Sequence, residues 1–445
     1  MLANDASRGQ NAATFSMQDI SGECKLRVFA PVLALLALAI LINYVDRGNL
    51  SIAAPALKAE LHISATRLGF LFSAFFYAYT AFIFLSSWLV DRFHVNWVLA
   101  AGFAVWSLAT AGTGLVTGFT TLFIMRLLLG MGESVAFPSS SKILAQNLPE
   151  YDRGFANGLI ICGMKLGPAA GTLGAGMLIA KYGWRPVFIG IGLASLLWLP
   201  AWFRWMPRGQ QAQARAASQT TRLGTAISNS ASYEDVLRQR SFWGACGGHF
   251  CANYLNYFLV SWLPFYLVHE RQHSMQTMVR IAGAFYVLDA LSAFATGWCS
   301  DLLIRRGNPV TVVRKGAMLV GGTVAALGLA GCAMAGPHTY LVWLAIMGVG
   351  SGVGGTGIFA FAQTLAGPGT AGRWAGLQNG FGNLSGWVSP ALTGYLLDRT
   401  GHFTAPLAIA AVVCLIGGLS WAFGVGRLEP VNWRLAEAEP LALAD

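Results

Sequence analysis

Six charged residues lie inside long apolar stretches of the sequence, where charge is otherwise scarce. They are Asp46, Arg47, Arg126, Glu133, Lys165 and Asp289. Because placing a charge at the centre of a lipid bilayer costs roughly 3 kcal/mol or more, such residues are few and usually functional. The three cations formally balance the three acids. We therefore expect a polar cavity between helices that holds a charged solute without leaving uncompensated charge.

Asp46 and Arg47 are adjacent and offer different chemistry. A guanidinium group presents a planar fork that binds a carboxylate through two hydrogen bonds, which makes Arg47 the best candidate anion ligand. The alternative role for Arg47 is structural: an arginine near a helix end can extend its charged group to the membrane surface. A buried carboxyl group can carry a proton at neutral pH, so Asp46 is a candidate proton site or else a fixed counter-charge to another helix. The two side chains point about 100° apart around a helix and cannot share one face.

Arg126 and Glu133 lie seven positions apart. On one helix this spacing is two turns, or about 10 Å, so a static salt bridge between them is unfavourable. Glu133 is the candidate for a second proton site. Arg126 is either its switching partner, a ligand for the solute, or a packing residue between helices.

Lys165 stands in the segment Gly163-Met-Lys-Leu-Gly167. A buried lysine is costly unless it is paired. It could bind a carboxylate of the solute, or it could pair with Asp46, Glu133 or Asp289, and the sequence favours neither reading. Asp289 itself has no assigned role.

Several polar and aromatic residues in apolar stretches are candidate solute ligands. They are Tyr44, Tyr79, Asn256, Tyr257, Gln378 and Asn383, with Trp262 and Ser385 as further cavity groups. Hydroxyls and amides suit a polyhydroxy acid, and aromatic side chains suit a ring. Taken singly, such residues more often form hydrogen bonds between membrane helices, and this alternative stays open for each.

Composition excludes most other classes of protein. Of the 445 residues, 55% are hydrophobic and 11% are charged, against about 25% charged in soluble domains. The net charge of +10 comes mainly from loops between apolar segments, which indicates membrane topology and not nucleic-acid binding.

The seven cysteines include no C-x-x-C pair, so we expect no metal site. No Walker A motif, H-E-x-x-H motif or catalytic triad is found, so we expect neither an enzyme nor a cofactor beyond a coupling proton, with sodium as the alternative ion.

Twelve apolar segments are long enough to span a membrane, which needs about 20 residues each. The expected spans are 28–56, 67–90, 95–117, 119–144, 154–180, 185–206, 241–267, 277–300, 311–335, 338–363, 372–397 and 403–426. They predict an all-α membrane protein with two six-helix halves, 28–206 and 241–426. The segment 207–240 is expected to be a cytoplasmic linker, and 1–27 and 427–445 cytoplasmic tails, the first of them disordered. Lys and Arg favour the side that holds both termini, so we expect an inner-membrane protein with cytoplasmic ends.

The two halves repeat each other at matching positions. Asp91-Arg92 ends the second span and Asp301 ends the eighth, while Lys181-Tyr-Gly-Trp closes the fifth and Arg399-Thr-Gly-His closes the eleventh. Parallel six-helix repeats with a binding site at their interface define one transporter architecture.

With these residues in view, the sequence resembles the major facilitator superfamily. Ser87-Trp-Leu-Val-Asp91-Arg92 is similar to its gating motif, although Ser87 replaces a glycine and the trailing basic pair is missing; Gly297-Trp-Cys-Ser-Asp301 is the second copy. Within the superfamily it resembles the anion:cation symporter family, which includes bacterial galactonate, glucarate and hexuronate permeases. The residues that carry this resemblance are Asn43-Tyr-Val-Asp46-Arg47, Arg126-x6-Glu133, the segment Asn253–Pro264 and Gly382-Asn383-Leu-Ser385.

The resemblance implies a transporter that imports a small organic carboxylate, most simply a sugar acid, together with protons by alternating access. It implies that Arg47 binds the anion, that Asp46 and Glu133 exchange protons, and that Asp91, Arg92 and Asp301 belong to gates. Relatives often have a neutral residue where this chain has Lys165, which favours an aromatic-acid or dicarboxylate permease as the alternative. A metabolite exporter, a membrane-embedded enzyme and a non-transporting sensor are the remaining rivals. By analogy we expect a monomer.

Overall fold

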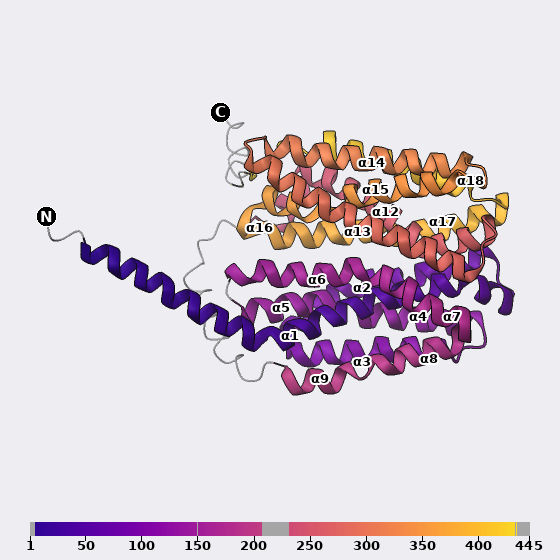
Figure 1. Ribbon diagram of the computed structural model, residues 1–445, viewed down its shortest axis with the longest axis horizontal. Coiled ribbons are helices and arrows are strands. Elements are labelled where there is room, and N and C mark those ends of the chain that lie inside the picture. Colours follow the sequence, from indigo (N-terminus) through magenta and orange to yellow (C-terminus); the bar gives the residue numbers. More distant parts are fainter. Residues whose placement is uncertain (1–4, 149, 207–230, 432, 434–445) are drawn as a thin grey trace, which may run out of the picture.

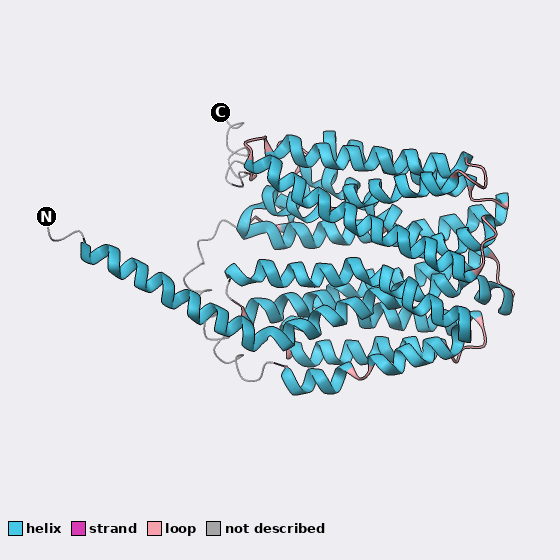
Figure 2. Ribbon diagram, in the orientation of Figure 1, coloured by secondary structure: helices cyan, strands magenta, loops and turns pink. Residues whose placement is uncertain are grey.

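The computed structural model describes residues 5–148, 150–206, 231–431 and 433, and all regular structure within them is helical (Figure 2). The N-terminal half, the N-half, comprises α1 (Asp5–Glu60), α2 (Ala65–Arg92), α3 (Val95–Thr113), α4 (Phe119–Glu133), α5 (Ala136–Asn147), α6 (Glu150–Ala170), the π-helical turn η1 (Gly171–Ala175), α7 (Gly176–Tyr182), α8 (Trp184–Ser195) and α9 (Trp198–Trp205).

The C-terminal half, the C-half, follows the same plan. It comprises α11 (Tyr233–Arg238), α12 (Arg240–Phe265), the π-helical turn η2 (Tyr266–Glu270), α13 (Met275–Arg305), α14 (Val310–Met334), α15 (Tyr340–Gly355), α16 (Ile358–Asn383), α17 (Ser385–Thr400), α18 (Thr404–Leu419) and the π-helical turn η3 (Ser420–Gly424). Helix α16 turns sharply at Gly367, whose φ of 68° is open to glycine but costly for other residues.

The helices correspond to the twelve expected spans. Ten segments of the described chain are long and apolar enough to cross a membrane. The other two expected spans, the seventh and the eleventh, fall on α12 and on the end of α16 with α17. These are the spans that carry many of the candidate polar ligands, including Asn256, Tyr257, Gln378 and Asn383. Their lower hydropathy is therefore consistent with a position that faces a polar interior.

The segments outside the spans differ from the sequence prediction in two places. The N-terminal tail was expected to be disordered, but α1 is helical from Asp5 and its first turns project from the bundle (Figure 1). The expected linker 207–240 contains the short helix α11, which begins with Ser232 and Asp235 in a reciprocal capping box. Residues 207–230, and most of the expected tail 427–445, lie outside the described part of the chain.

Equivalent spans of the two halves end at equivalent glycines. Gly183 follows α7 with a φ of 81°, and Gly401 follows α17 with a φ of 74°. This region of backbone space is accessible to glycine without the steric cost that a Cβ atom would bring. These are the glycines of the repeated closing motifs, so the repeat in the sequence corresponds to a repeat in the fold.

The halves lie side by side, with both chain ends at one end of the bundle (Figure 1). We call the opposite end the distal end. One apolar core there joins both halves and includes Leu57 and Trp262. Toward the termini the core divides: one cluster around Trp106 belongs to the N-half except for Tyr257, and another around Trp374 belongs to the C-half. The halves are thus joined at the distal end and packed separately toward the termini.

The closest contact between the halves is the α2–α17 seam, where two glycines let the backbones meet. A Cβ atom at Gly69 would overlap the carbonyl oxygen of Pro390, and one at Gly394 would overlap that of Ala65. Small residues permit this approach between membrane helices. The seam therefore depends on glycine at both positions.

The distal start of α2 is capped from the other half. The carboxylate of Asp398 accepts hydrogen bonds from the backbone N–H groups of Ala65 at 2.9 Å and Thr66 at 2.7 Å. The next N–H group, that of Arg67, donates to the Ser64 hydroxyl at 3.2 Å. The first N–H groups of a helix have no partner within it, so a residue from the C-half completes this helix end.

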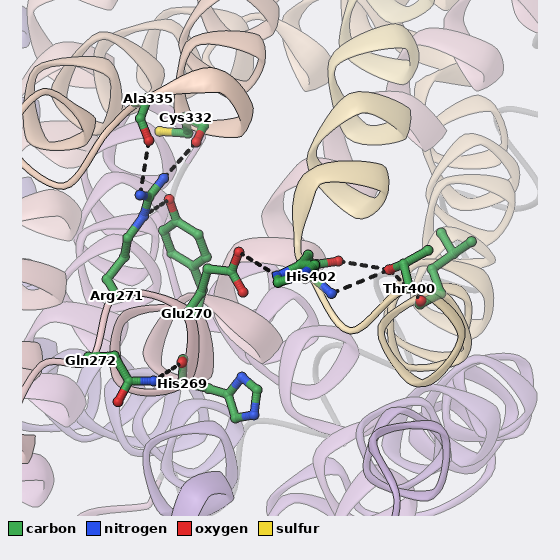
Figure 3. A network of polar contacts seen from close by, with 10 residues as sticks. His269, Glu270, Arg271, Gln272, Cys332, Ala335, Thr400 and His402 are labelled. Atoms are coloured by element: carbon green, nitrogen blue, oxygen red, sulfur yellow. Dashed lines mark hydrogen bonds and ion pairs between the residues drawn. The ribbon is translucent and has the colours of Figure 1, made fainter.

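The distal loops of the C-half are tied together by polar contacts (Figure 3). Arg271 donates to the carbonyl oxygens of Ala335 at 3.0 Å and Cys332 at 2.8 Å. Beside it, Glu270 Oε1 lies 3.6 Å from His402 Nδ1. These contacts connect the end of η2 to the loops after α14 and α17, which makes the distal end of the C-half one packed unit.

Candidate functional site

A buried ion pair joins two helices of the N-half. Arg47 Nε of α1 donates to Glu133 Oε2 of α4 at 2.7 Å. Arg47 is 9% exposed and Glu133 is fully buried. Removing one partner of such a pair costs about 3–5 kcal/mol, because the other charge is left without compensation. The pair is thus stable unless another anion binds Arg47 in place of Glu133, or a proton neutralises Glu133.

Three aromatic rings surround the Arg47 guanidinium. Its Cζ atom lies 4.5 Å from the ring centre of Tyr44, 4.9 Å from that of Phe75 and 4.7 Å from that of Tyr79. Phe75 and Tyr79 are four residues apart on α2, so they share one face of the helix, and their rings stack. Ring faces attract cations, most strongly where water is excluded. We call these three rings with Arg47 the arginine box.

Asp46 and Arg126 complete the charged group within the N-half. Asp46 is 1% exposed, and its Oδ1 accepts from Asn49 Nδ2 at 3.3 Å. Arg126 is 4% exposed and its Cζ lies 5.3 Å from the ring centre of Phe75, so it is adjacent to the arginine box. In the described part of the chain, Asp46 Oδ2 and Arg126 Nε have no hydrogen-bond partner. Asp46 can therefore still bind a proton, and Arg126 can still donate a hydrogen bond to an anion.

The C-half faces the arginine box with Tyr257 of α12. Its ring lies 4.1 Å from that of Phe76, the neighbour of Phe75, and its hydroxyl donates to Asn383 Oδ1 at 2.5 Å. Asn383 Nδ2 in turn donates to the carbonyl oxygen of Asn379 at 2.8 Å. The expected ligands Tyr257 and Asn383 are thus brought together, on the opposite side of the interface from Arg47.

Other predicted ligands lie in different surroundings. Asn256 is exposed although α12 packs against both halves, and it lines a small cavity with Asp289. Gln378 is 1% exposed; its Oε1 accepts from Trp374 Nε1 at 3.0 Å and its Nε2 lies 3.4 Å from His249 Nδ1. These contacts place Gln378 in the packing of the C-half and do not bring it to the arginine box. Lys165 lies on α6, and its side chain is outside the described part of the structure.

The expected gating residues lie near the ends of their helices. Arg92 and Asp301 are exposed, and the side chain of Asp91 is not among those described. Lys142 of α5, which the sequence reasoning did not single out, donates to the carbonyl oxygen of Val90 at 2.6 Å. This contact ties the end of α2 to α5 at the end of the bundle near the termini.

Sequence reasoning missed two further residues, Phe75 and Asp398. Phe75 is one of several phenylalanines in an apolar helix, and only its spacing of four from Tyr79 could have marked it. Asp398 stands next to Arg399 at the end of a span, where a charged residue is unremarkable.

The chemistry available at the site is that of binding and proton exchange. Among the described residues, no group of three His, Cys, Asp or Glu side chains could hold a metal ion. Two guanidinium groups can bind an anion, and two buried carboxyl groups can exchange protons. Membrane-length helices in two similar halves around such a site define a membrane transport protein and not an enzyme.

The comparison with known families agrees with this class. The chain matches the model of the Major Facilitator Superfamily over residues 36–386, and it belongs to that family. The expected fold of twelve helices in two halves is confirmed, and the chain is an integral membrane protein.

The chain is similar to several transporters of known or assigned solute. It is 29% identical to the "Hexuronate transporter" of Bacillus subtilis over 88% of this chain and 93% of that protein. It is 28% identical to the "Probable sulfoacetate transporter SauU" of Cupriavidus necator, over 88% and 93%, and to the "Probable galactarate/D-glucarate transporter GudP" of Escherichia coli, over 90% and 94%.

Solved structures show the same fold at low sequence identity. A bacterial homologue of the human lysosomal transporter Spinster, in an inward-facing and occupied conformation, aligns with a TM-score of 0.72 at 16% identity, over 88% of this chain and 96% of that one. The D-xylose-proton symporter aligns with a TM-score of 0.71 at 13% identity, over 90% and 98%.

Proposed function

We propose that this transporter imports a small organic anion, most simply a sugar acid, together with protons. The observation that carries the proposal is the buried Arg47–Glu133 pair inside a ring of aromatic side chains at the interface of the halves. The names of the three bacterial relatives support an organic anion as solute, and two of those names specify sugar acids.

The ion pair suggests how solute and proton are coupled. A solute carboxylate that binds Arg47 competes with Glu133 for the same guanidinium. Once displaced, the Glu133 carboxylate would be buried without its partner, which is costly unless it takes up a proton. Anion binding and protonation of Glu133 therefore favour each other. Release of the anion returns Arg47 to Glu133 and expels the proton.

Asp46 and Arg126 provide the second charge pair of this scheme. Arg126 lies beside the arginine box, where its Nε can donate to a further oxygen of the solute. Asp46 is buried with one oxygen free to bind a proton. Protonation of Asp46 together with Glu133 would leave a combined charge of +2 on Arg47 and Arg126 for the bound anion to balance.

The packing of the halves supports alternating access as the transport cycle. Their shared core and the α2–α17 seam close the distal end, and the cores divide toward the termini. We further infer cytoplasmic termini in a bacterial inner membrane, from the distribution of Lys and Arg, and a monomeric transporter. The conformation described is then closed to the outside, and exposed Arg92 and Asp301 lie on the cytoplasmic side.

The test is uptake by proteoliposomes that contain the purified chain, with an inward proton gradient. The panel contains galacturonate, galactarate, sulfoacetate, an aromatic acid and a neutral sugar. We expect accumulation of a sugar acid, no accumulation of the neutral sugar, and loss of accumulation in Arg47→Ala. Preference for galactarate over galacturonate would narrow the solute to sugar dicarboxylates, whereas preference for sulfoacetate or the aromatic acid would move the solute class to sulfonates or aromatic acids. Equal uptake by Arg47→Ala would refute the role of the arginine box.

A further inference from the structure

A small polar cavity lies between the halves on the C-half side of the arginine box. Its volume is about 30 Å³, and its lining includes Pro168 of α6, Asn256 of α12, Tyr286 and Asp289 of α13 and Ser351 of α15. Three of the four helices belong to the C-half and one to the N-half. The cavity is thus lined by both halves, which is what a binding site for a transported solute requires.

Two of the helices that line this cavity also pack beside the arginine box. Pro168 follows Gly167, and Gly167 packs so closely on Tyr44 that a Cβ atom there would overlap the Tyr44 Cβ. Asn256 precedes Tyr257, which rests on Phe76. The cavity and the arginine box therefore lie against the same two helices, α6 and α12.

The lining groups favour a hydrogen-bond donor. Tyr286 already donates its hydroxyl proton to the carbonyl oxygen of Leu259 at 3.2 Å. Asp289 carries acceptor oxygens with about four lone-pair positions, so it can accept from a solute in addition to its contacts within the protein. Asn256 is exposed and offers both an acceptor and a donor. A solute hydroxyl can donate to Asp289 and pair with Asn256 at the same time.

The size and the charge of the cavity both bear on what can enter. A cavity needs about 10–15 Å³ of space to hold one water molecule, so 30 Å³ accommodates a hydroxyl group together with about one water molecule. A second carboxylate would bring its negative charge against the acidic side chain of Asp289. The site is therefore suited to a hydroxyl at the end of the solute away from the bound carboxylate.

We propose that Asp289 and Asn256 form a hydroxyl subsite that makes this transporter prefer hydroxylated monocarboxylates over acids that lack hydroxyl groups. This inference rests on the proposed function, because the subsite acts on a solute whose carboxylate is held at Arg47. Asp289 is then a specificity-determining residue, a role that the sequence alone did not give it.

The test compares two acids of the same ring size, galacturonate and tetrahydropyran-2-carboxylate, which lacks the hydroxyls. A hydrogen bond to a charged group contributes about 1.5–3 kcal/mol, so we expect the wild type to prefer galacturonate by about 10- to 100-fold in kcat/KM. In Asp289→Asn, KM for galacturonate should rise about 10-fold while KM for the hydroxyl-free acid stays unchanged. Asn256→Ala, on a different helix, should shift the two acids in the same unequal way.

The control is Glu234→Gln, which removes an exposed acid paired with Arg238 on α11 and should change neither KM. Size-exclusion profiles and the amount of protein in the vesicles identify variants that fail to fold. Equal uptake of both acids by the wild type, or an equal effect of Asp289→Asn and Asn256→Ala on both acids, would overturn the subsite and leave the proposed function standing. A wild type that takes up no anion at all would refute the proposed function, and the subsite with it.

Discussion

The cap that Asp398 places on α2 should hold the distal end of the transporter closed. This carboxylate of the C-half accepts from the N–H groups of Ala65 and Thr66 in the N-half. Opening the distal end separates the α2–α17 seam and exposes both N–H groups to water. Removing the carboxylate in Asp398→Ala therefore destabilises the closed state, while the open state, in which the cap is already broken, is little affected.

The size of the effect follows from the contacts. Loss of a capping side chain costs about 0.5–2 kcal/mol, typically about 1 kcal/mol. Asp398 is exposed, so water screens part of its charge and a value near 1 kcal/mol is appropriate. At 1.4 kcal/mol for each factor of ten, the open fraction should rise about fivefold. Asp398→Asn keeps an acceptor oxygen and should give a smaller increase.

Thiol labelling of the seam measures this fraction. Ser73 of α2 is fully buried, and its hydroxyl donates to the carbonyl oxygen of Trp387 on α17 at 3.1 Å. In a chain whose native cysteines are replaced, Ser73→Cys can react with a maleimide only when the seam opens. We expect Asp398→Ala to raise the labelling rate about fivefold and the neighbouring Arg399→Ala to leave it unchanged. An unchanged rate in Asp398→Ala would refute the role of the cap.

Three further outcomes follow from the site. Arg47→Lys keeps the charge but loses the planar fork, so kcat/KM for the anion should fall about 100-fold, and uptake at the wild-type rate would contradict bidentate binding. The Glu133→Gln side chain cannot bind or release a proton. We therefore expect this variant still to swap labelled for unlabelled anion across the membrane but not to accumulate the anion against a gradient. Accumulation at the wild-type level would exclude Glu133 as the coupling group. Tyr257→Phe removes the donor to Asn383 and should destabilise the protein by about 1–3 kcal/mol, measured as a lower midpoint of thermal unfolding in detergent; an unchanged midpoint would contradict the buried hydrogen bond.

The sequence predicted the spans, and the burial of Asp46, Arg47, Arg126 and Glu133 within them, because both depend on local composition. Apolar length marks a membrane helix wherever the helix packs, and a charge within one is conspicuous. The glycine of each closing motif was also visible, and it marks the same helix end in both halves.

Pairings across helices could not be predicted in this way. Spacing along one helix brought Glu133 into relation with Arg126, but its partner in the structure is Arg47, which is 86 residues away. Gln378 is one of the predicted ligands, and spacing along α16 explains its contact with Trp374 four residues away but not its approach to His249 on α12 at 3.4 Å. The order of residues around a single helix does not determine which neighbouring helix each face will meet.

Proton entry driven by a sugar acid would demonstrate coupling of the anion to protons in this transporter. Proteoliposomes loaded with a pH-sensitive dye and containing the wild type or Arg47→Ala are given galacturonate without any imposed proton gradient. We expect the lumen of the wild-type vesicles to acidify as the acid enters, and Arg47→Ala to give no change. Uptake of galacturonate by the wild type without acidification would contradict proton coupling through the Arg47–Glu133 pair.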